Sequence, residues 1–61
     1  MTREEIINEV NKRGAKIIDS SDSLLKVQFE HKDRAVWFHW KMLHEEINSY
    51  WSGENVLLIS L

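Results

Sequence analysis

The sequence has no cysteine and no proline, and only two of its 61 residues are glycine. Without cysteine, the chain can form neither disulfide bonds nor thiolate zinc sites. Proline and glycine are the usual interruptions of helices and strands, so their scarcity allows nearly every residue to belong to regular structure. We expect one compact domain covering residues 1–61, because a chain of this length cannot be divided further.

Long apolar runs are also missing. No stretch approaches the ~20 apolar residues that a membrane-spanning helix requires. Residues 1–5 are charged and do not begin an apolar run, which does not fit a secretory signal. These features predict a cytoplasmic protein that does not enter a membrane.

The chain lacks an excess of positive charge. Eight Lys and Arg stand against ten Asp and Glu, for a formal net charge of −2. Nucleic-acid-binding proteins usually carry a basic excess, because phosphate neutralisation drives their affinity, so a nucleic-acid partner is disfavoured. A core in a chain this small rarely supplies more than ~3–5 kcal/mol of net stability. Self-association would add to it, and we expect a homodimer.

The N-terminal residues predict a helix over residues 3–13. Thr2 and Glu5 have the spacing of a capping box, in which each side chain bonds the other residue's backbone N–H. Apolar residues follow at Ile6 and Val10, four apart, as on one face of a helix. Gly14 then suits the left-handed position that ends many helices.

Strands are expected on both sides of a polar turn at residues 20–23, over residues 15–19 and 25–30. In the second of these, Leu25 and Val27 alternate with Lys26 and Gln28, which indicates a strand with one buried face. The last strand is expected at residues 56–61, a nearly continuous apolar run. Such a run is either buried inside a sheet or exposed at an edge that a second copy of the chain can pair with.

Residues 35–40 fit two structures. As a strand they complete a hairpin across residues 32–33, which places Val36 and Phe38 on the inner face with Val27. As part of a helix over residues 34–51, they contribute to a broad apolar stripe but leave Phe38 on the polar side. Because aromatic residues favour strands, we prefer the strand. In either case residues 43–51 are expected to be helical.

The predicted fold class is therefore α+β, a small single-layer antiparallel sheet with two helices in the order α-β-β-β-α-β. The alternative is α-β-β-α-β with one long second helix. The first order resembles that of double-stranded-RNA-binding domains and of the HicA-type toxins that share their fold. Those domains have a lysine-rich start to their second helix, where residues 42–46 here carry two glutamates. The toxins have a catalytic histidine early in the second strand, and residues 21–25 have none.

No arrangement of residues predicts an active site. The three histidines, His31, His39 and His44, lack the spacing of zinc ligands on a helix. The serines of residues 20–23 are typical of a turn, and there is no glycine-rich phosphate loop. We expect a protein that is not an enzyme and that needs no cofactor or metal.

The predicted function is binding to another protein through an exposed aromatic face of the sheet. The strand reading projects Trp37 and His39 from that face, with Lys26 and Gln28 as cross-strand neighbours. A competing interpretation covers this face with a helix and makes Trp37 a core residue. The alternative function is RNA binding, with Trp37 stacking on bases. The phosphates would be held by Lys12, Arg13 and Lys16 at the end of the first helix and by Arg34 nearby.

Overall fold

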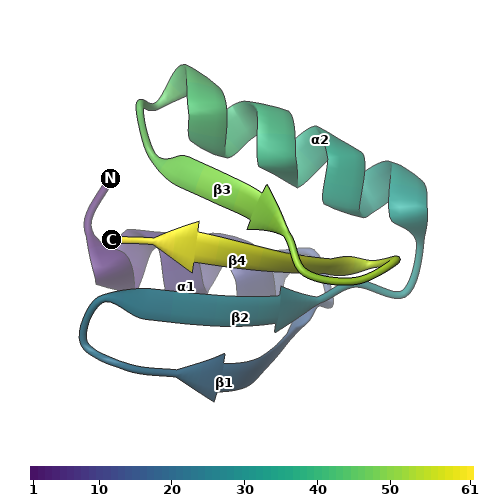
Figure 1. Ribbon diagram of the computed structural model, residues 1–61, viewed down its shortest axis with the longest axis horizontal. Coiled ribbons are helices and arrows are strands. Elements are labelled where there is room, and N and C mark those ends of the chain that lie inside the picture. The colour runs from purple at the N-terminus through teal and green to yellow at the C-terminus, as the bar shows by residue number, and fades with distance from the viewer.

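The computed structural model describes all 61 residues and has two helices and four strands in the order α-β-β-α-β-β. The elements are α1 (Arg3–Lys12), β1 (Lys16–Ser20), β2 (Leu24–Gln28), α2 (Lys32–His44), β3 (Asn48–Trp51) and β4 (Val56–Ser60). The strands form one antiparallel sheet in the order β1-β2-β4-β3 (Figure 1). The predicted class, a small α+β fold with one antiparallel sheet and two helices, is confirmed.

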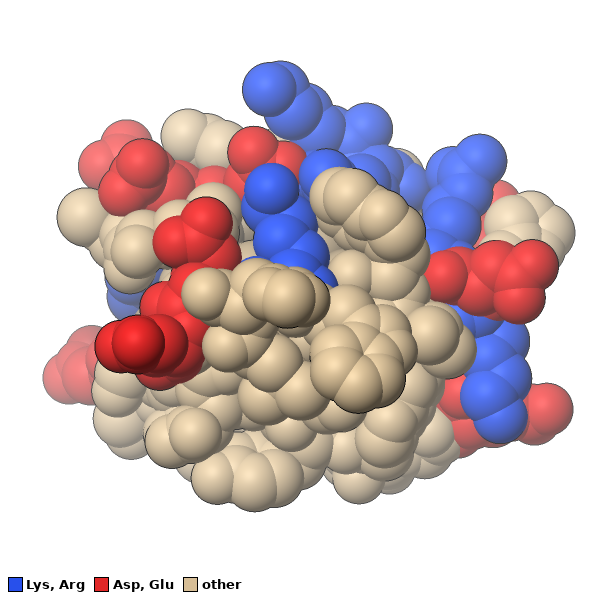
Figure 2. Space-filling view, turned by 90° about the horizontal axis from the view of Figure 1, so that it is seen from above, with Lys and Arg blue, Asp and Glu red and all other residues tan.

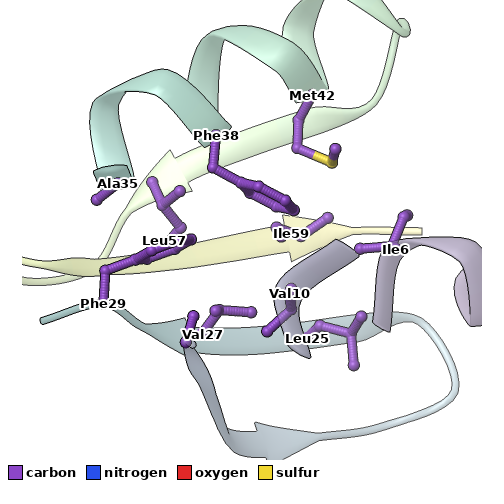
Figure 3. Close-up of a cluster of buried hydrophobic side chains, with 11 residues drawn as sticks. Ile6, Val10, Leu25, Val27, Phe29, Ala35, Phe38, Met42, Leu57 and Ile59 are labelled. Carbon is purple, nitrogen blue, oxygen red and sulfur yellow. The ribbon is translucent and has the colours of Figure 1, made fainter. Parts of the chain in front are cut away.

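Both helices pack on the same face of the sheet and enclose one hydrophobic core (Figures 1 and 3). Phe38 points from α2 toward the strands, and its ring centroid lies 5.5 Å from that of Phe29. The core cluster consists of eleven buried side chains: Ile6, Val10, Ala15, Leu25, Val27, Phe29, Ala35, Phe38, Met42, Leu57 and Ile59. Alternation along β2 therefore leaves Lys26 and Gln28 on the sheet face without helices.

The N-terminal predictions agree with the structure. Thr2 caps α1: its hydroxyl accepts from the backbone N–H of Glu5, and the Glu5 carboxylate accepts from the backbone N–H of Thr2. Ile6 and Val10 are the fully buried residues of this helix. Gly14 follows the helix with φ of +71°, the left-handed conformation expected of it.

The predicted strand at residues 35–40 is wrong, because this segment lies inside α2. The helical alternative was right in kind but assigned the wrong buried face. Phe38 is fully buried, with Ala35 and Met42 three residues before and four residues after it. The larger Trp37 and Trp40 are instead 54% and 58% exposed. The space between α2 and the sheet is filled by medium-sized side chains, and the indoles point outward.

The predicted helix over residues 43–51 is also wrong beyond residue 44. The chain leaves α2 at Glu46, which has φ of +61°, and residues 48–51 form the edge strand β3. Positive φ is uncommon for residues other than glycine, so the sequence carried no stop signal here. Two strands, rather than three, precede the second helix, and the order of elements expected from double-stranded-RNA-binding domains is not present.

The C-terminal strand was predicted correctly, and it lies inside the sheet. β4 pairs with β2 on one side and with β3 on the other, so it offers no free edge to a second copy of the chain. A homodimer would have to use another surface, and it stays a prediction. Neither helix has the length and hydropathy of a membrane-spanning segment.

Candidate functional site

Three tryptophans form the most conspicuous exposed feature of the molecule. Trp37 and Trp40 stand on the outer side of α2, and Trp51, 42% exposed, ends the neighbouring strand β3. Trp51 pairs across the sheet with the buried Leu57 and so lies on the sheet face that carries the helices. We call Trp37, Trp40 and Trp51 the tryptophan band.

His39 connects the two elements that carry the band. Its ring centroid lies 5.4 Å from that of Trp51 and 6.4 Å from that of Trp40. Its Nδ1 atom shares a hydrogen bond of 2.9 Å with the hydroxyl of Ser49, which is buried in β3. This bond holds α2 against β3 and fixes the position of the imidazole between the two indoles.

Two cationic side chains lie against the ring of Trp37. The guanidinium of Arg13 lies 4.6 Å from the centre of its ring, and the Nζ of Lys41 lies 5.5 Å away, both within cation–π range. Arg13 also pairs with Glu9 one turn earlier in α1, and this hydrogen bond lowers the pKa of the Glu9 carboxyl below its ordinary value. Arg34 donates to the backbone carbonyl of Arg13 at 3.4 Å. These contacts join the end of α1 to the outer side of α2.

Three adjoining hollows follow the tryptophan band. The first, about 430 Å³, is lined by Lys12, Arg13, Asp33, Arg34 and Trp37. The second, about 520 Å³, is lined by Asp33, Val36, Trp37, Trp40, Lys41 and His44. The third, about 510 Å³, is lined by Lys32, Val36, His39, Trp40, Trp51, Gly53 and Glu54. Because each hollow shares two residues with the next, they form one track across α2.

Charge is unevenly distributed around this track. Five of the eight basic residues of the chain line it, with only two of the ten acidic ones, which gives it a formal charge of +3 in a molecule of −2. Figure 2 looks onto this side of the molecule and shows uncharged surface across the centre, basic side chains at the top, acidic side chains at the left, and both kinds at the right. The hollows along the tryptophan band are thus net basic, whereas the wider rim of this side carries charges of both signs.

The structure separates the four residues predicted to form one protein-binding patch. Trp37, which belongs to the tryptophan band, and His39 lie on α2, whereas Lys26 and Gln28 lie on the opposite face of the sheet. The predicted grouping is therefore wrong, because it rested on a hairpin that does not form. The competing interpretation of Trp37 as a core residue is also wrong, since more than half of its surface is exposed.

The four residues predicted to contact phosphates are mostly brought together. Lys12, Arg13 and Arg34 line the first hollow, although the chain carries them on two different helices. Lys16 stands apart at the start of β1, beside a separate hollow that it shares with Gln28. The structure thus places Trp37 beside three of these cations.

Sequence reasoning missed Trp40, Trp51 and Lys41 as members of this surface. Both tryptophans belong to the apolar stripe of the helical alternative, which was interpreted as buried. In the structure Trp40 lies on the outer face of α2, and Trp51 lies on β3. The signal was the presence of large apolar residues on nearly all sides of one helix, which cannot all be buried against a single sheet. Such a helix either packs against a second surface or exposes some of its indole rings to water.

A metal site is not evident, since no three His, Asp or Glu side chains lie close enough together to hold an ion. The opposite face of the sheet also exposes apolar groups. The largest is Tyr50, which is 55% exposed, but no second aromatic ring stands beside it there.

Comparisons of the chain with protein-family models, with curated proteins and with solved structures gave no match.

Proposed function

We propose that this protein acts without catalysis, by binding another protein through the tryptophan band. The observation that supports this most is the distribution of apolar side chains on α2. The smaller ones are buried, and the two tryptophans are exposed. Tryptophan is the side chain most enriched among the residues that dominate binding energy at protein interfaces. A surface built of three of them fits a partner that covers them.

The size of the surface supports the same proposal. A tryptophan side chain buries up to ~250 Å². At the exposures observed, the three indoles together offer roughly 400 Å² of apolar surface, which is about half of the ~800 Å² that each partner contributes to a standard interface. The bordering side chains of α1 and α2 can supply the remainder as a polar rim.

The test compares two side chains of similar exposure on different faces. Trp40→Ala removes the most exposed indole of the tryptophan band, and Tyr50→Ala removes an aromatic ring from the opposite sheet face. Tagged wild-type protein and both variants are used to capture proteins from the native host, and captured proteins are quantified by mass spectrometry. We expect a partner that is captured by wild type and Tyr50→Ala but reduced at least tenfold with Trp40→Ala. Equal capture by all three proteins would contradict the proposal. The cytoplasmic location stays a prediction, which cell fractionation tests.

A second candidate function is binding of single-stranded nucleic acid. It is favoured by the first hollow, where Lys12, Arg13 and Arg34 stand beside Trp37. Stacking of bases on aromatic rings next to phosphate-binding cations is the usual arrangement in such proteins. Binding of this kind would weaken steeply with added salt.

A further inference from the structure

We infer that the partner presents a segment with carboxylates at one end and apolar side chains at the other, aligned along the track of three hollows. This inference rests on the proposed function, because it names the chemistry of the partner for the same surface. It is carried by the polarity of the track, which is basic where α1 meets α2 and aromatic where α2 meets β3.

The basic end has unpaired positive charge. Lys12, Arg13 and Arg34 line the first hollow, with Asp33 as its only acidic residue. The single ion pair of the structure joins Arg13 to Glu9, so Lys12 and Arg34 have no carboxylate partner. Charge-assisted hydrogen bonds to carboxylates are the strongest contacts these groups can form, and an acidic segment would supply them.

The other end of the track is aromatic and has no net charge. Trp40 and Trp51 line the third hollow with His39, which is held in place by its bond to Ser49. The two charged residues of this hollow, Lys32 and Glu54, are of opposite sign. A leucine, phenylalanine or tryptophan side chain from the partner would gain most there, because apolar anchors seated between rigid aromatic rings dominate binding energy. The two ends together select a segment whose charge changes along its length.

The carboxylates within the track disfavour nucleic acid. Asp33 lines both the first and the second hollow, and Glu54 lines the third. A nucleic-acid strand carries a negative charge at every nucleotide and would bring phosphates near both carboxylates. A peptide can restrict its acidic residues to the basic end, so a protein segment fits the track better than a polyanion.

Charge also disfavours a second copy of the chain as the occupant. Pairing one tryptophan band with another would bring two tracks of formal charge +3 together. Like charges facing each other across an interface weaken association. An acidic partner is attracted by the same charge.

The experiment selects peptides on the intact protein. A phage library of random 12-residue peptides is selected on immobilised wild-type protein and counter-selected on Trp40→Ala. We expect the enriched peptides to contain clustered Asp and Glu next to Leu, Phe or Trp. Affinities of one enriched peptide are then measured by fluorescence anisotropy for wild type, Arg34→Glu and Arg3→Glu. Arg3 lies at the other end of α1, so the last variant changes the net charge equally without touching the track.

Arg34→Glu should weaken binding at least tenfold, while Arg3→Glu should change it less than twofold. Enriched peptides that are apolar without acidic residues, or equal effects of the two charge reversals, would overturn the inference and leave the proposed function standing. Failure to enrich any peptide over Trp40→Ala would count against both.

Two further measurements test the other two possible occupants of the track, nucleic acid and a second copy of the chain. Tighter binding of a fluorescent oligodeoxythymidine than of the selected peptide, with loss in Arg34→Glu, would overturn the inference in favour of nucleic acid. Sedimentation that shows a dimer of the wild-type protein, abolished by Trp40→Ala, would overturn it in favour of a second copy. Monomeric protein with weak oligonucleotide binding supports the acidic segment.

Discussion

The two helices lie against the same face of the sheet, but their outer sides differ in chemistry. The exposed residues of α1 are all polar, and its two fully buried residues, Ile6 and Val10, are both apolar. α2 buries Phe38 but exposes Trp37 and Trp40. The core therefore buries the apolar side chains of α1, whereas α2 has more apolar surface than the core buries. This surplus of exposed apolar surface on α2 is the feature on which the proposed binding rests.

The ends of the two helices repeat one backbone arrangement with different residues. After α1, the N–H groups of Gly14 and Ala15 donate back to the carbonyls of Asn11 and Val10, at 3.1 and 3.2 Å. After α2, the N–H of Glu46 donates to Leu43 at 3.0 Å, and that of Ile47 to Met42 at 2.9 Å. Both are Schellman motifs, and their left-handed residues are Gly14 and Glu46.

The largest effect is expected when the buried side of α2 is changed rather than its exposed side. Phe38→Ala removes a fully buried ring from the core and should lower the free energy of unfolding by ~3–5 kcal/mol. That is about the whole stability expected of so small a domain. Trp40→Ala removes an exposed ring and should change the free energy of unfolding by less than ~0.5 kcal/mol. Urea unfolding followed by circular dichroism measures both. Similar losses for the two variants would mean that Trp40 is part of the core.

The same contrast explains how much of the fold the sequence could predict. Helix α1 and the strands β1, β2 and β4 have local signals: a capping box, a helix-ending Gly14, and alternating or continuous apolar residues. These signals act over a few residues, so they can be interpreted without knowledge of the tertiary structure. The predictions for these four elements agree with the structure to within a few residues.

The second half of the chain lacked such signals. His31 precedes α2 without making a side-chain cap, and Glu46 ends the helix where a glycine is usual. Aromatic residues around Phe38 favour strands, and only the space available between α2 and the sheet decides that this ring is buried and Trp37 is not. The candidate site was therefore only partly predictable. Trp37 and the basic residues Lys12, Arg13 and Arg34 were recognised, whereas the rest of the surface was not, because its grouping depends on how α2 packs.

A smaller effect on stability is expected from substitutions at the left-handed residues that follow the two helices. Gly14→Ala should lower the free energy of unfolding by ~1 kcal/mol, because a Cβ strains the left-handed conformation. No heavy atom lies within 4 Å of the position that this Cβ would take, so the loss measures the backbone alone. Glu46→Gly should act in the opposite direction and raise the free energy of unfolding by ~0.5–1 kcal/mol. Thermal unfolding of the two variants and wild type tests the pair.

Two controls separate backbone strain from a general effect of these substitutions. Gly53→Ala adds a Cβ at a glycine that is not left-handed, and its nearest contacts, to Val56, are an ordinary 3.5 Å. This variant should be neutral or slightly stabilising. Glu45→Gly, at a residue with φ of −89°, should not stabilise the protein. An increase in stability for Glu45→Gly as large as that for Glu46→Gly would contradict the explanation.

The smallest expected effect distinguishes the capped start of α1 from the uncapped start of α2. Hydrogen bonding from the Thr2 backbone, and secondarily from its side chain, lowers the pKa of the Glu5 carboxyl below its ordinary value. A carboxyl whose pKa is lower in the folded state stabilises the protein above its unfolded-state pKa, and this contribution is lost as the pH falls through the folded-state pKa. Stability should thus be constant from pH 7 to about 5 as far as this group is concerned, and should fall below the ordinary glutamate pKa of ~4.3.

Glu5→Gln removes this titration, so the decrease in melting temperature between pH 7 and pH 3 should be smaller than in wild type. Glu4→Gln is the matched control, because Glu4 lies in the same first turn but makes no capping hydrogen bond. Both variants lose one negative charge near the start of the helix, where negative charge is favourable, so that contribution cancels between them. If the acid-induced decrease is the same for Glu5→Gln and Glu4→Gln, the capping box does not contribute to the pH dependence. A smaller decrease for Glu5→Gln alone assigns that part of the acid sensitivity to the capped start of α1, a device that α2 lacks.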